Sequence, residues 1–391
     1  MLPFIFVSGV HQATTENPVN MKKLNTRFIL PSKNRALFPF IMALSFFLYP
    51  YPSGILQGQP DAEEKSIFDY LSKEGAIIQL VLETDLNELI NNRMRGDYQP
   101  AQLFFVEEGD SIQLEVDVIP RGNYRRRICD FPPILLNFSK NYLAGRGLNK
   151  EYDKMKLVSH CQKEQGAQDQ LLKEFLAYKL YNVASHASYR VQLAWITYKD
   201  SKGKQKNIEQ YGILVEDTDE MAHRIGGLEC DCRNYPADSI ATAEENTMAV
   251  FQYMIGNEDW SLQMLRNVKL IRPYNGGRII PVPYDFDFSG FVNASYAVPR
   301  SQLGITDIRQ RIFLGSPASE ERLTETLKAF ERQREQFRAT VQNFESLSGF
   351  QRKSALKYLD GFFKKKQQSK LVAEVAEKRA TQKENAAVST Y

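Results

Sequence analysis

The chain has 391 residues, of which 43% are hydrophobic and 25% charged, proportions typical of a globular protein. They exclude a polytopic membrane protein, a collagen and a wholly disordered chain. Fifty basic and 47 acidic residues give a formal net charge of +3, so no nucleic-acid partner is predicted. Four cysteines are too few for a disulfide-dense scaffold, and the length fits two domains or one large two-lobed domain.

The first part of the chain has the pattern of an export signal. Met21 is followed by a basic stretch and then by the apolar run 36–48, ALFPFIMALSFFL. The run is short for a membrane span and contains Pro39. We expect 1–58 to be a leader or anchor, with Met21 as the native start and 1–20 as an extension of the sequence. An exported protein is predicted, periplasmic, envelope-associated or secreted; a buried helix is the alternative.

The body of the chain is predicted to be β-rich over 61–217 and α-rich over 218–350. Apolar alternation and turn residues predict strands at 76–83, 103–106, 112–118, 134–138, 155–158, 187–198 and 208–215. Helical spacing predicts helices at 85–93, 170–184 and 241–255, and helices dominate from Ser319 onward. A short strand pair is expected near 268–271 and 278–282. The predicted fold class is therefore α+β.

A basic tail covers 351–391, with ten basic and four acidic residues, a local charge of 10 − 4 = +6. We expect it to be helical. The pattern is compatible with peripheral contact to an anionic membrane or envelope polymer, and also with a solvated helix that frays after about Ala380.

The cysteines allow a geometric prediction. If the strands at 131–138 and 154–158 pair antiparallel about Gly145, Cys129 and Cys161 face each other, which is compatible with a cross-strand disulfide. Free buried thiols are the alternative. For Cys230 and Cys232, with His223 seven residues upstream, a His/Cys/Cys metal site is conceivable but lacks a fourth ligand.

Lys156 is a cation on an otherwise apolar strand, and Glu174 follows on the helix 170–184. A strand lysine paired with a carboxylate on the next helix is how kinase folds hold the α- and β-phosphates of a nucleotide. An edge-strand lysine beside a solvated glutamate is the alternative. Further along, the apolar strand that ends in Glu216 and Asp217 would suit a connector between two lobes.

Two later segments carry the acidic residues of a candidate site. Asp259 follows a predicted helix and could accept a proton, and Asn267 could place its amide oxygen on a divalent cation. Helix-end capping is the alternative for both residues. Asp285 and Asp287 stand at i and i+2 among apolar residues, after Pro281 and Pro283 hold the chain extended. Such carboxylates need a partner, and Mg²⁺ is a natural one.

The order of these segments resembles the CotH family, named for the bacterial spore-coat protein H, an atypical secreted kinase-like group. The resemblance covers about 110–295. It depends on Arg121-Gly122-Asn123, on the strand–lysine–helix unit 155–184 and on Gly212–Glu216. It depends above all on Asn257-Glu258-Asp259-Trp260 and Val282-Pro283-Tyr284-Asp285-Phe286-Asp287.

The resemblance implies a kinase-like fold of two lobes, with ATP and Mg²⁺ or Mn²⁺ bound between them. It puts Asp259 in the catalytic place and Asp285 in the metal-binding place, with Asn267 and Asp287 as further metal ligands. Lys156, Glu174, Arg121 and Glu216 would contact or support the nucleotide. Arg121 lies in the loop that would cover the phosphates, where Tyr124 replaces a small hydroxyl residue. Arg125-Arg126-Arg127 is a further cationic patch, for phosphates or an acidic substrate, or simply a solvated edge.

Three functions are compatible with these residues. The first is phosphoryl transfer to a hydroxyl acceptor on an unknown protein or glycan. The second is a non-catalytic surface or envelope scaffold that keeps the fold, since ATP is scarce outside the cytoplasm. The third is a carbohydrate-active hydrolase that uses a carboxylate pair such as Glu216 with Asp259 or Asp285. Only two tryptophans, Trp195 and Trp260, are present for stacking on sugars.

Overall fold

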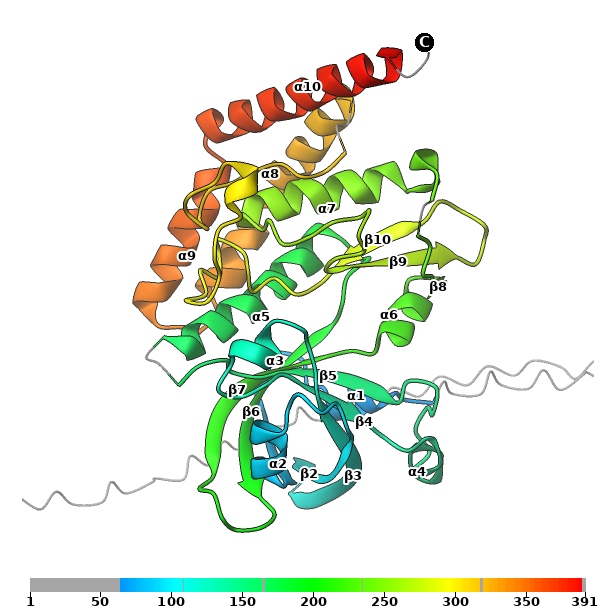
Figure 1. Cartoon of the computed structure of the whole chain (residues 1–391), viewed down its shortest axis with the longest axis vertical. Helices are drawn as coiled ribbons and strands as arrows, with labels where there is room; N and C mark the ends of the chain where they lie inside the picture. Colours follow the sequence, from blue (N-terminus) through cyan, green and yellow to red (C-terminus); the bar gives the residue numbers. More distant parts are fainter. Residues whose placement is uncertain (1–63, 108, 164–165, 234, 317–318, 389–391) are drawn as a thin grey trace, which may run out of the picture. The chain divides into compact units, whose positions relative to one another are not determined.

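The computed structural model describes residues 64–388 except 108, 164–165, 234 and 317–318 (Figure 1). The predicted leader, residues 1–58, lies outside the described residues. Within the described ranges, no helix is both long and apolar enough to cross a membrane. The described residues all belong to one compact unit.

Seven strands close into a barrel in the order β1-β2-β3-β4-β5-β7-β6, and the parallel pairing of β1 with β6 closes it. The strands are β1 (Ile78–Thr84), β2 (Gln99–Glu107), β3 (Asp110–Pro120), β4 (Ile134–Asn137), β5 (Lys154–Val158), β6 (Val191–Asp200) and β7 (Ile208–Val215). The alternation that predicted β3 also sets its orientation, because Leu114, Val116 and Val118 are buried inside the barrel while their neighbours face outward. The predicted β-rich first region is confirmed.

Five helices accompany the barrel: α1 (Ile67–Leu71), α2 (Leu86–Asn91), α3 (Arg125–Ile128), α4 (Lys140–Gly145) and α5 (Ala167–Ala184). Asp85 begins α2 as predicted, because its carboxylate accepts a hydrogen bond from Glu88 N at 3.0 Å. The long helix α5 lies between barrel strands in the sequence, but its apolar residues belong to the core of the second lobe. It therefore joins the two halves of the structure.

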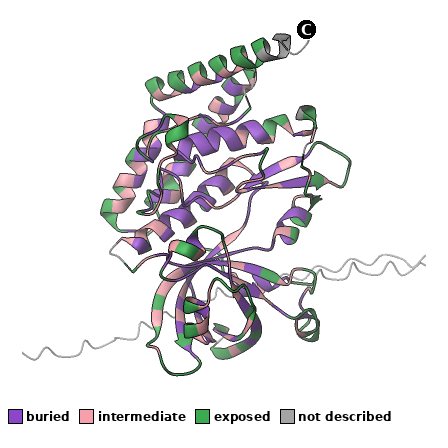
Figure 2. Ribbon diagram, in the orientation of Figure 1, coloured by how far each residue is buried: buried purple, intermediate pink, exposed green. Residues whose placement is uncertain are grey.

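The second lobe is mainly helical and carries a small antiparallel sheet in the order β10-β9-β8. Its elements are α6 (Thr218–Arg224), β8 (Gly227–Glu229), η1 (Ala237–Ser239), α7 (Thr242–Ile255), β9 (Val268–Pro273), β10 (Ile280–Pro283), η2 (Ser301–Leu303) and α8 (Glu320–Gln342). Figure 2 shows α7 buried along most of its length, with the other elements packed around it. The predicted helical second part is confirmed.

The basic tail differs from the prediction of one solvated helix. It forms two helices, α9 (Gly349–Phe362) and α10 (Lys365–Val388). Both helices bury apolar residues in the core of the second lobe, including Leu359, Phe362 and Leu371. Tyr358 on α9 illustrates the attachment, since the guanidinium groups of Arg309 and Arg311 lie over its ring, 4.7 and 4.0 Å from the centroid. Contact of the tail with a membrane or envelope stays a prediction.

The predicted disulfide between Cys129 and Cys161 is present. Strands β4 and β5 pair antiparallel between the two cysteines, with Ile134 opposite Leu157, one residue from the register we expected. The conceivable metal site at His223 is wrong, because Cys230 and Cys232 are joined to each other in a second disulfide. The His223 ring lies instead against the ring of Tyr274.

We predict that the double variant Cys129→Ala/Cys161→Ala loses about 3–4 kcal/mol of unfolding free energy, because the bridge closes a loop of 32 residues. Urea unfolding of the oxidised proteins measures the loss. The control is Cys230→Ala/Cys232→Ala, which opens a loop of separation 2 and should cost much less. Equal losses in the two double variants would contradict the explanation.

Candidate functional site

The candidate site lies where the barrel meets the helical lobe. Strand β5 carries Lys156, which pairs with Val215 at the end of β7. Residues 216–217 then lead directly into α6 of the second lobe. In Figure 1, α3 and α5 lie at the level where the two lobes meet. Lys156 is thus held at this junction by the sheet itself.

Lys156 is half-buried between two aromatic rings. Its Nζ atom lies 4.9 Å from the ring centroids of both Tyr189 and Tyr284, and it donates a hydrogen bond to Thr218 Oγ1 at 3.1 Å. Desolvation, followed by the nearby positive charges of Arg121 and Lys269, lowers the pKa of Lys156 to about 7. No carboxylate of the described residues forms an ion pair with it. An anion bound here would therefore gain a strong interaction.

The predicted ion pair between Lys156 and Glu174 is not formed. Arg125, on the short helix α3, takes the place of the lysine: its Nη1 atom lies 3.3 Å from Glu174 Oε2 and 3.9 Å from Asp287 Oδ2. Its Nη2 atom donates to the carbonyl of Ser159 at 2.7 Å. The exposed fractions of Arg125, Glu174 and Asp287 are 8%, 1% and 3%, so the whole cluster is buried.

One guanidinium group cannot fully neutralise two buried carboxylates. Burial raises the pKa of Glu174 to about 7, although Arg125 opposes the shift. The pKa of Asp287 is raised well above its usual range by burial and then by the charges of Asp285 and Glu174. Tyr296 donates a hydrogen bond to Asp287 Oδ2 at 3.0 Å. The cluster therefore holds a proton near neutral pH.

Asp285 lies two residues after the end of β10 in a left-handed backbone conformation, with φ of 63°. Its backbone N–H donates to Tyr178 Oη at 2.9 Å, which fixes the turn. Its carboxylate forms no hydrogen bond or ion pair with any described residue. The negative charge nevertheless raises the pKa of both Asp259 and Asp287. Asp285 is therefore an unpaired acid at the centre of the site.

Asp259 and Asn267 are brought together as a pair. Asn267 Nδ2 donates to the carbonyl of Asp259 at 2.7 Å and to its Oδ2 atom at 3.0 Å. Arg266 Nη1 lies 3.4 Å from Asp259 Oδ1. Burial raises the pKa of Asp259, and Arg266 opposes the shift. Asn267 has a positive φ of 51°, and its carbonyl accepts from Tyr284 N at 3.0 Å, so the pair lies next to Asp285 along the backbone.

These residues fit a divalent cation only in part. The carboxylate of Asp285 and the amide oxygen of Asn267 have no hydrogen-bond donor among the described residues. Asp287, the third predicted ligand, is instead engaged by Arg125 and Tyr296. Within the described ranges, no group of three or more His, Cys, Asp or Glu side chains could hold a metal ion. Because Mg²⁺ in proteins often has one or two carboxylate ligands and takes the rest from phosphates and water, the residues fit a cation that arrives with a phosphate ligand.

Arg121 faces the same site from the barrel. Its backbone N–H donates to Pro133 O at 2.8 Å, and its charge lowers the pKa of Lys156. Its guanidinium forms no hydrogen bond or ion pair with the described residues. Tyr124, from the same loop, has its ring 5.4 Å from that of Phe288 in the second lobe. The loop thus spans the two lobes, as a loop covering phosphates would.

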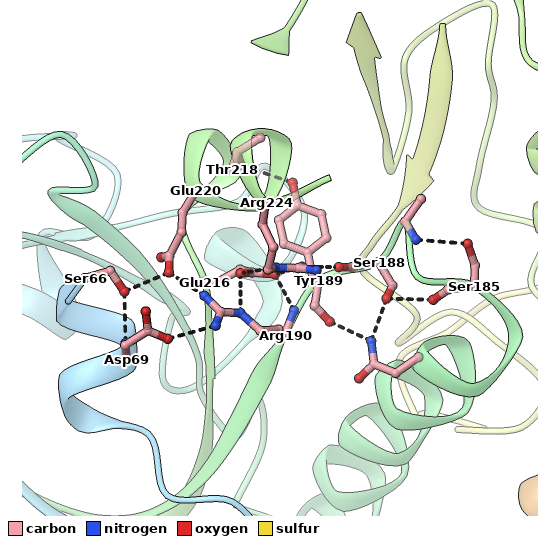
Figure 3. A network of polar contacts seen from close by, with 12 residues as sticks. Ser66, Asp69, Ser185, Ser188, Tyr189, Arg190, Glu216, Thr218, Glu220 and Arg224 are labelled. Atoms are coloured by element: carbon pink, nitrogen blue, oxygen red, sulfur yellow. Dashed lines mark hydrogen bonds and ion pairs between the residues drawn. The ribbon is translucent and has the colours of Figure 1, made fainter. Parts of the chain in front are cut away.

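Glu216 does not face the site. Figure 3 shows its carboxylate between Arg190 and Arg224, and both side chains donate to it. Arg190 also binds Asp69 on α1 and Glu220 on α6, so the carboxylate belongs to a network that ties the start of the described chain to the second lobe. With both oxygens occupied, Glu216 is unsuited to be half of a hydrolase carboxylate pair. Its predicted contact with a nucleotide is not supported by the geometry of the side chain.

No protein-family model matches the chain, and no curated protein sequence matches it. Among solved structures, the chain is similar to the crystal structure of a Helicobacter pylori proinflammatory kinase, CtkA. The identity is 13%, the match covers 64% of this chain and 94% of that chain, and the TM-score is 0.36. At these values no residue role is transferred from that protein. What the chain itself defines is an α+β protein with a closed barrel lobe, a helical lobe and an ionisable site at their junction.

We predict that Arg125→Gln lowers the unfolding free energy by about 3–5 kcal/mol, because it leaves Glu174 and Asp287 buried without their cation. Urea denaturation at pH 8, where the carboxylates are most charged, measures the loss. Arg127→Gln, on the same helix but exposed, is the matched control and should change stability by less than about 0.5 kcal/mol. A similar small change in both variants would show that the buried cluster does not stabilise the fold.

Proposed function

We propose that this chain is a kinase-like phosphotransferase that binds a nucleoside triphosphate with Mg²⁺ or Mn²⁺ between its lobes and transfers a phosphoryl group to a hydroxyl acceptor. One observation carries the proposal: neither Lys156 nor Asp285 has an ion-pair partner among the described residues, and the residue before Asp285 lies against Lys156. The ring of Tyr284 covers Lys156, and the next residue is Asp285. A phosphate with its cation would satisfy both charges at once.

The proposed roles follow from the surroundings of each residue. Lys156, with Arg121 beside it, binds the phosphate oxygens, and gains its full charge when they arrive. Asp285 and the amide oxygen of Asn267 would hold the metal ion, which when bound neutralises charge on the phosphates. Asp287 stays paired with Arg125 and fixes the position of the segment after β10. It does not take the metal-ligand role that its sequence position predicts.

Asp259 is the proposed catalytic residue. Its carboxylate accepts the proton of the acceptor hydroxyl as the hydroxyl oxygen forms a bond to the γ-phosphorus. The bond from that phosphorus to the bridging oxygen breaks, and the nucleoside diphosphate leaves. Asn267 holds Asp259 by one hydrogen bond to its backbone carbonyl and one to its carboxylate, and the raised pKa of Asp259 brings it nearer to the range where it can accept a proton.

The resemblance to the CotH family and the export of the chain are part of the proposal. Two disulfides among the described residues are compatible with an oxidising compartment, where such bonds persist. The acceptor, on a protein or a glycan, follows only from the resemblance. The non-catalytic scaffold is the outcome to expect if nucleotide binds without transfer.

We predict that ATP and Mg²⁺ together raise the melting temperature, whereas either alone gives a much smaller shift, because the site supplies too few metal ligands by itself. At 100 times its Kd a ligand stabilises the fold by about 2.7 kcal/mol, which is a shift of several degrees. In Asp285→Asn the metal-dependent part of the shift should disappear.

The matched control for that titration is Asp97→Asn, an exposed acid in the turn between α2 and β2, which should behave as the wild type does. An unchanged metal-dependent shift in Asp285→Asn would remove Asp285 from the metal site. The absence of any shift at millimolar ATP in the wild type would remove the nucleotide site altogether.

We further predict that Asp259→Asn binds ATP as tightly as the wild type but transfers the γ-phosphoryl group about 10²–10⁴-fold more slowly, because the general base is lost while the fold and metal site stay intact. Transfer of labelled γ-phosphate to the protein itself or to water provides the assay. Equal rates in variant and wild type would contradict the role of Asp259. Binding without transfer in the wild type would favour the scaffold.

A further inference from the structure

A hollow of about 580 Å³ on the barrel lobe is lined by eight residues, of which four are cations. It lies beside helix α3 but outside the site described above. Arg125 points into the buried cluster, whereas the next two residues of the helix line the hollow. Its charged residues are Arg93, Arg126, Arg127, Lys163 and Asp130. Four positive charges and one negative charge give a local charge of 4 − 1 = +3.

The cations of this hollow have no acidic partners. Within the described residues, none of the four side chains forms an ion pair, and Arg93 donates only to backbone carbonyls, that of Cys129 at 2.6 Å among them. The Nε atom of Arg126 is buried without a hydrogen-bond partner. Asp130, the one carboxylate among the described lining residues, accepts a hydrogen bond from the backbone N–H of Lys163 at 3.2 Å. Like charges held together in this way repel one another, and a bound anion would relieve the repulsion.

The frame of the hollow is rigid. The disulfide between Cys129 and Cys161 connects the segment of Arg126 and Arg127 to the segment of Lys163. Beside it, Asp130 N donates to Cys161 O at 2.8 Å, and Arg127 N donates to Tyr124 O at 2.9 Å. The cations are thus assembled before any ligand arrives, which reduces the entropic cost of binding.

We propose that this hollow is a binding site for a phosphate group, separate from the proposed nucleotide site. Three guanidinium groups offer the planar, forked donors that match phosphate oxygens, and Lys163 adds a fourth charge. A volume of about 580 Å³ exceeds one phosphate ion, so the phosphate can belong to inorganic phosphate or to a phosphorylated side chain of a peptide. The recognised chemistry is the same for both sources.

The test is calorimetric titration with inorganic phosphate and with a short phosphoserine peptide, at constant ionic strength. In Arg126→Gln/Arg127→Gln the affinity for the phosphate-bearing probe should fall at least about tenfold, because two charge-assisted donors are lost. Lys202→Gln/Lys204→Gln removes the same charge from the turn between β6 and β7 and is the matched control. Lys156→Met should lose ATP binding but keep phosphate binding, which separates this proposal from the proposed function.

A second variant changes the affinity in the opposite direction. Asp130→Asn removes the one acid among the described residues that line the hollow but keeps an oxygen for Lys163 N, so phosphate should bind several-fold more tightly, a gain that misfolding cannot imitate. Tighter binding of the phosphopeptide than of its serine form and of inorganic phosphate would identify a phosphorylated chain as the ligand; equal binding of both phosphates would identify the free ion. The proposal is overturned if neither probe binds at about 10 mM, ten times the Kd of a 1 mM ligand, or if the arginine and lysine double variants behave alike.

Discussion

The structure depends on Arg125 and the two carboxylates that share it. The arginine comes from the barrel lobe, Glu174 from the helix that joins the lobes, and Asp287 from the segment after β10. Removing three ionisable groups from water is costly, and the cost is tolerable only while all three remain together. The cluster therefore couples the packing of the two lobes to the position of the acidic segment.

That coupling explains how the remaining residues of the site are arranged. With Asp287 held by Arg125, the chain two residues earlier turns through a left-handed conformation at Asp285 and leaves its carboxylate free. Asn267 also has a positive φ, and it connects Asp259 to the backbone of Tyr284, the residue before Asp285. Non-glycine residues in this conformation cost free energy, so the surrounding structure must hold both of them in place. On the barrel side of the site, Lys156 contacts only two aromatic rings and the hydroxyl of Thr218 among the described residues.

Much of this arrangement could be predicted from the sequence, and the exceptions have physical reasons. Alternation along 112–118 fixed which side chains enter the barrel, and the spacing of Cys129 and Cys161 about a turn predicted their bond. The proximity of Asp259, Asn267 and Asp285 followed from the resemblance to the CotH family. The true partner of Glu174 did not, because a run of three arginines does not reveal which one a four-residue helix turns inward.

Long-range packing set the other limits. In the sequence, helix α5 lies within the β-rich region, but its apolar side chains pack in the core of the second lobe. Hydrophobic periodicity cannot show which of two cores a helix will join. Glu216 ends an apolar strand as a connector should, but only the fold brings Arg190 and Arg224 to it. The tail looked solvated because its charges are numerous, although the apolar residues between them are enough to dock two helices.

The most direct test of the central claim is the pH titration of the Lys156 side chain by NMR, with and without ATP and Mg²⁺. The free protein should show a midpoint near 7, and saturating nucleotide should raise the midpoint by at least about one pH unit, because a phosphate within about 6 Å favours the charged amine. By linkage, the affinity for nucleotide should then fall as pH rises above 7. Lys156→Met identifies the resonance by its loss. A midpoint near 10 in the free protein, or no change when nucleotide is bound, would contradict the account.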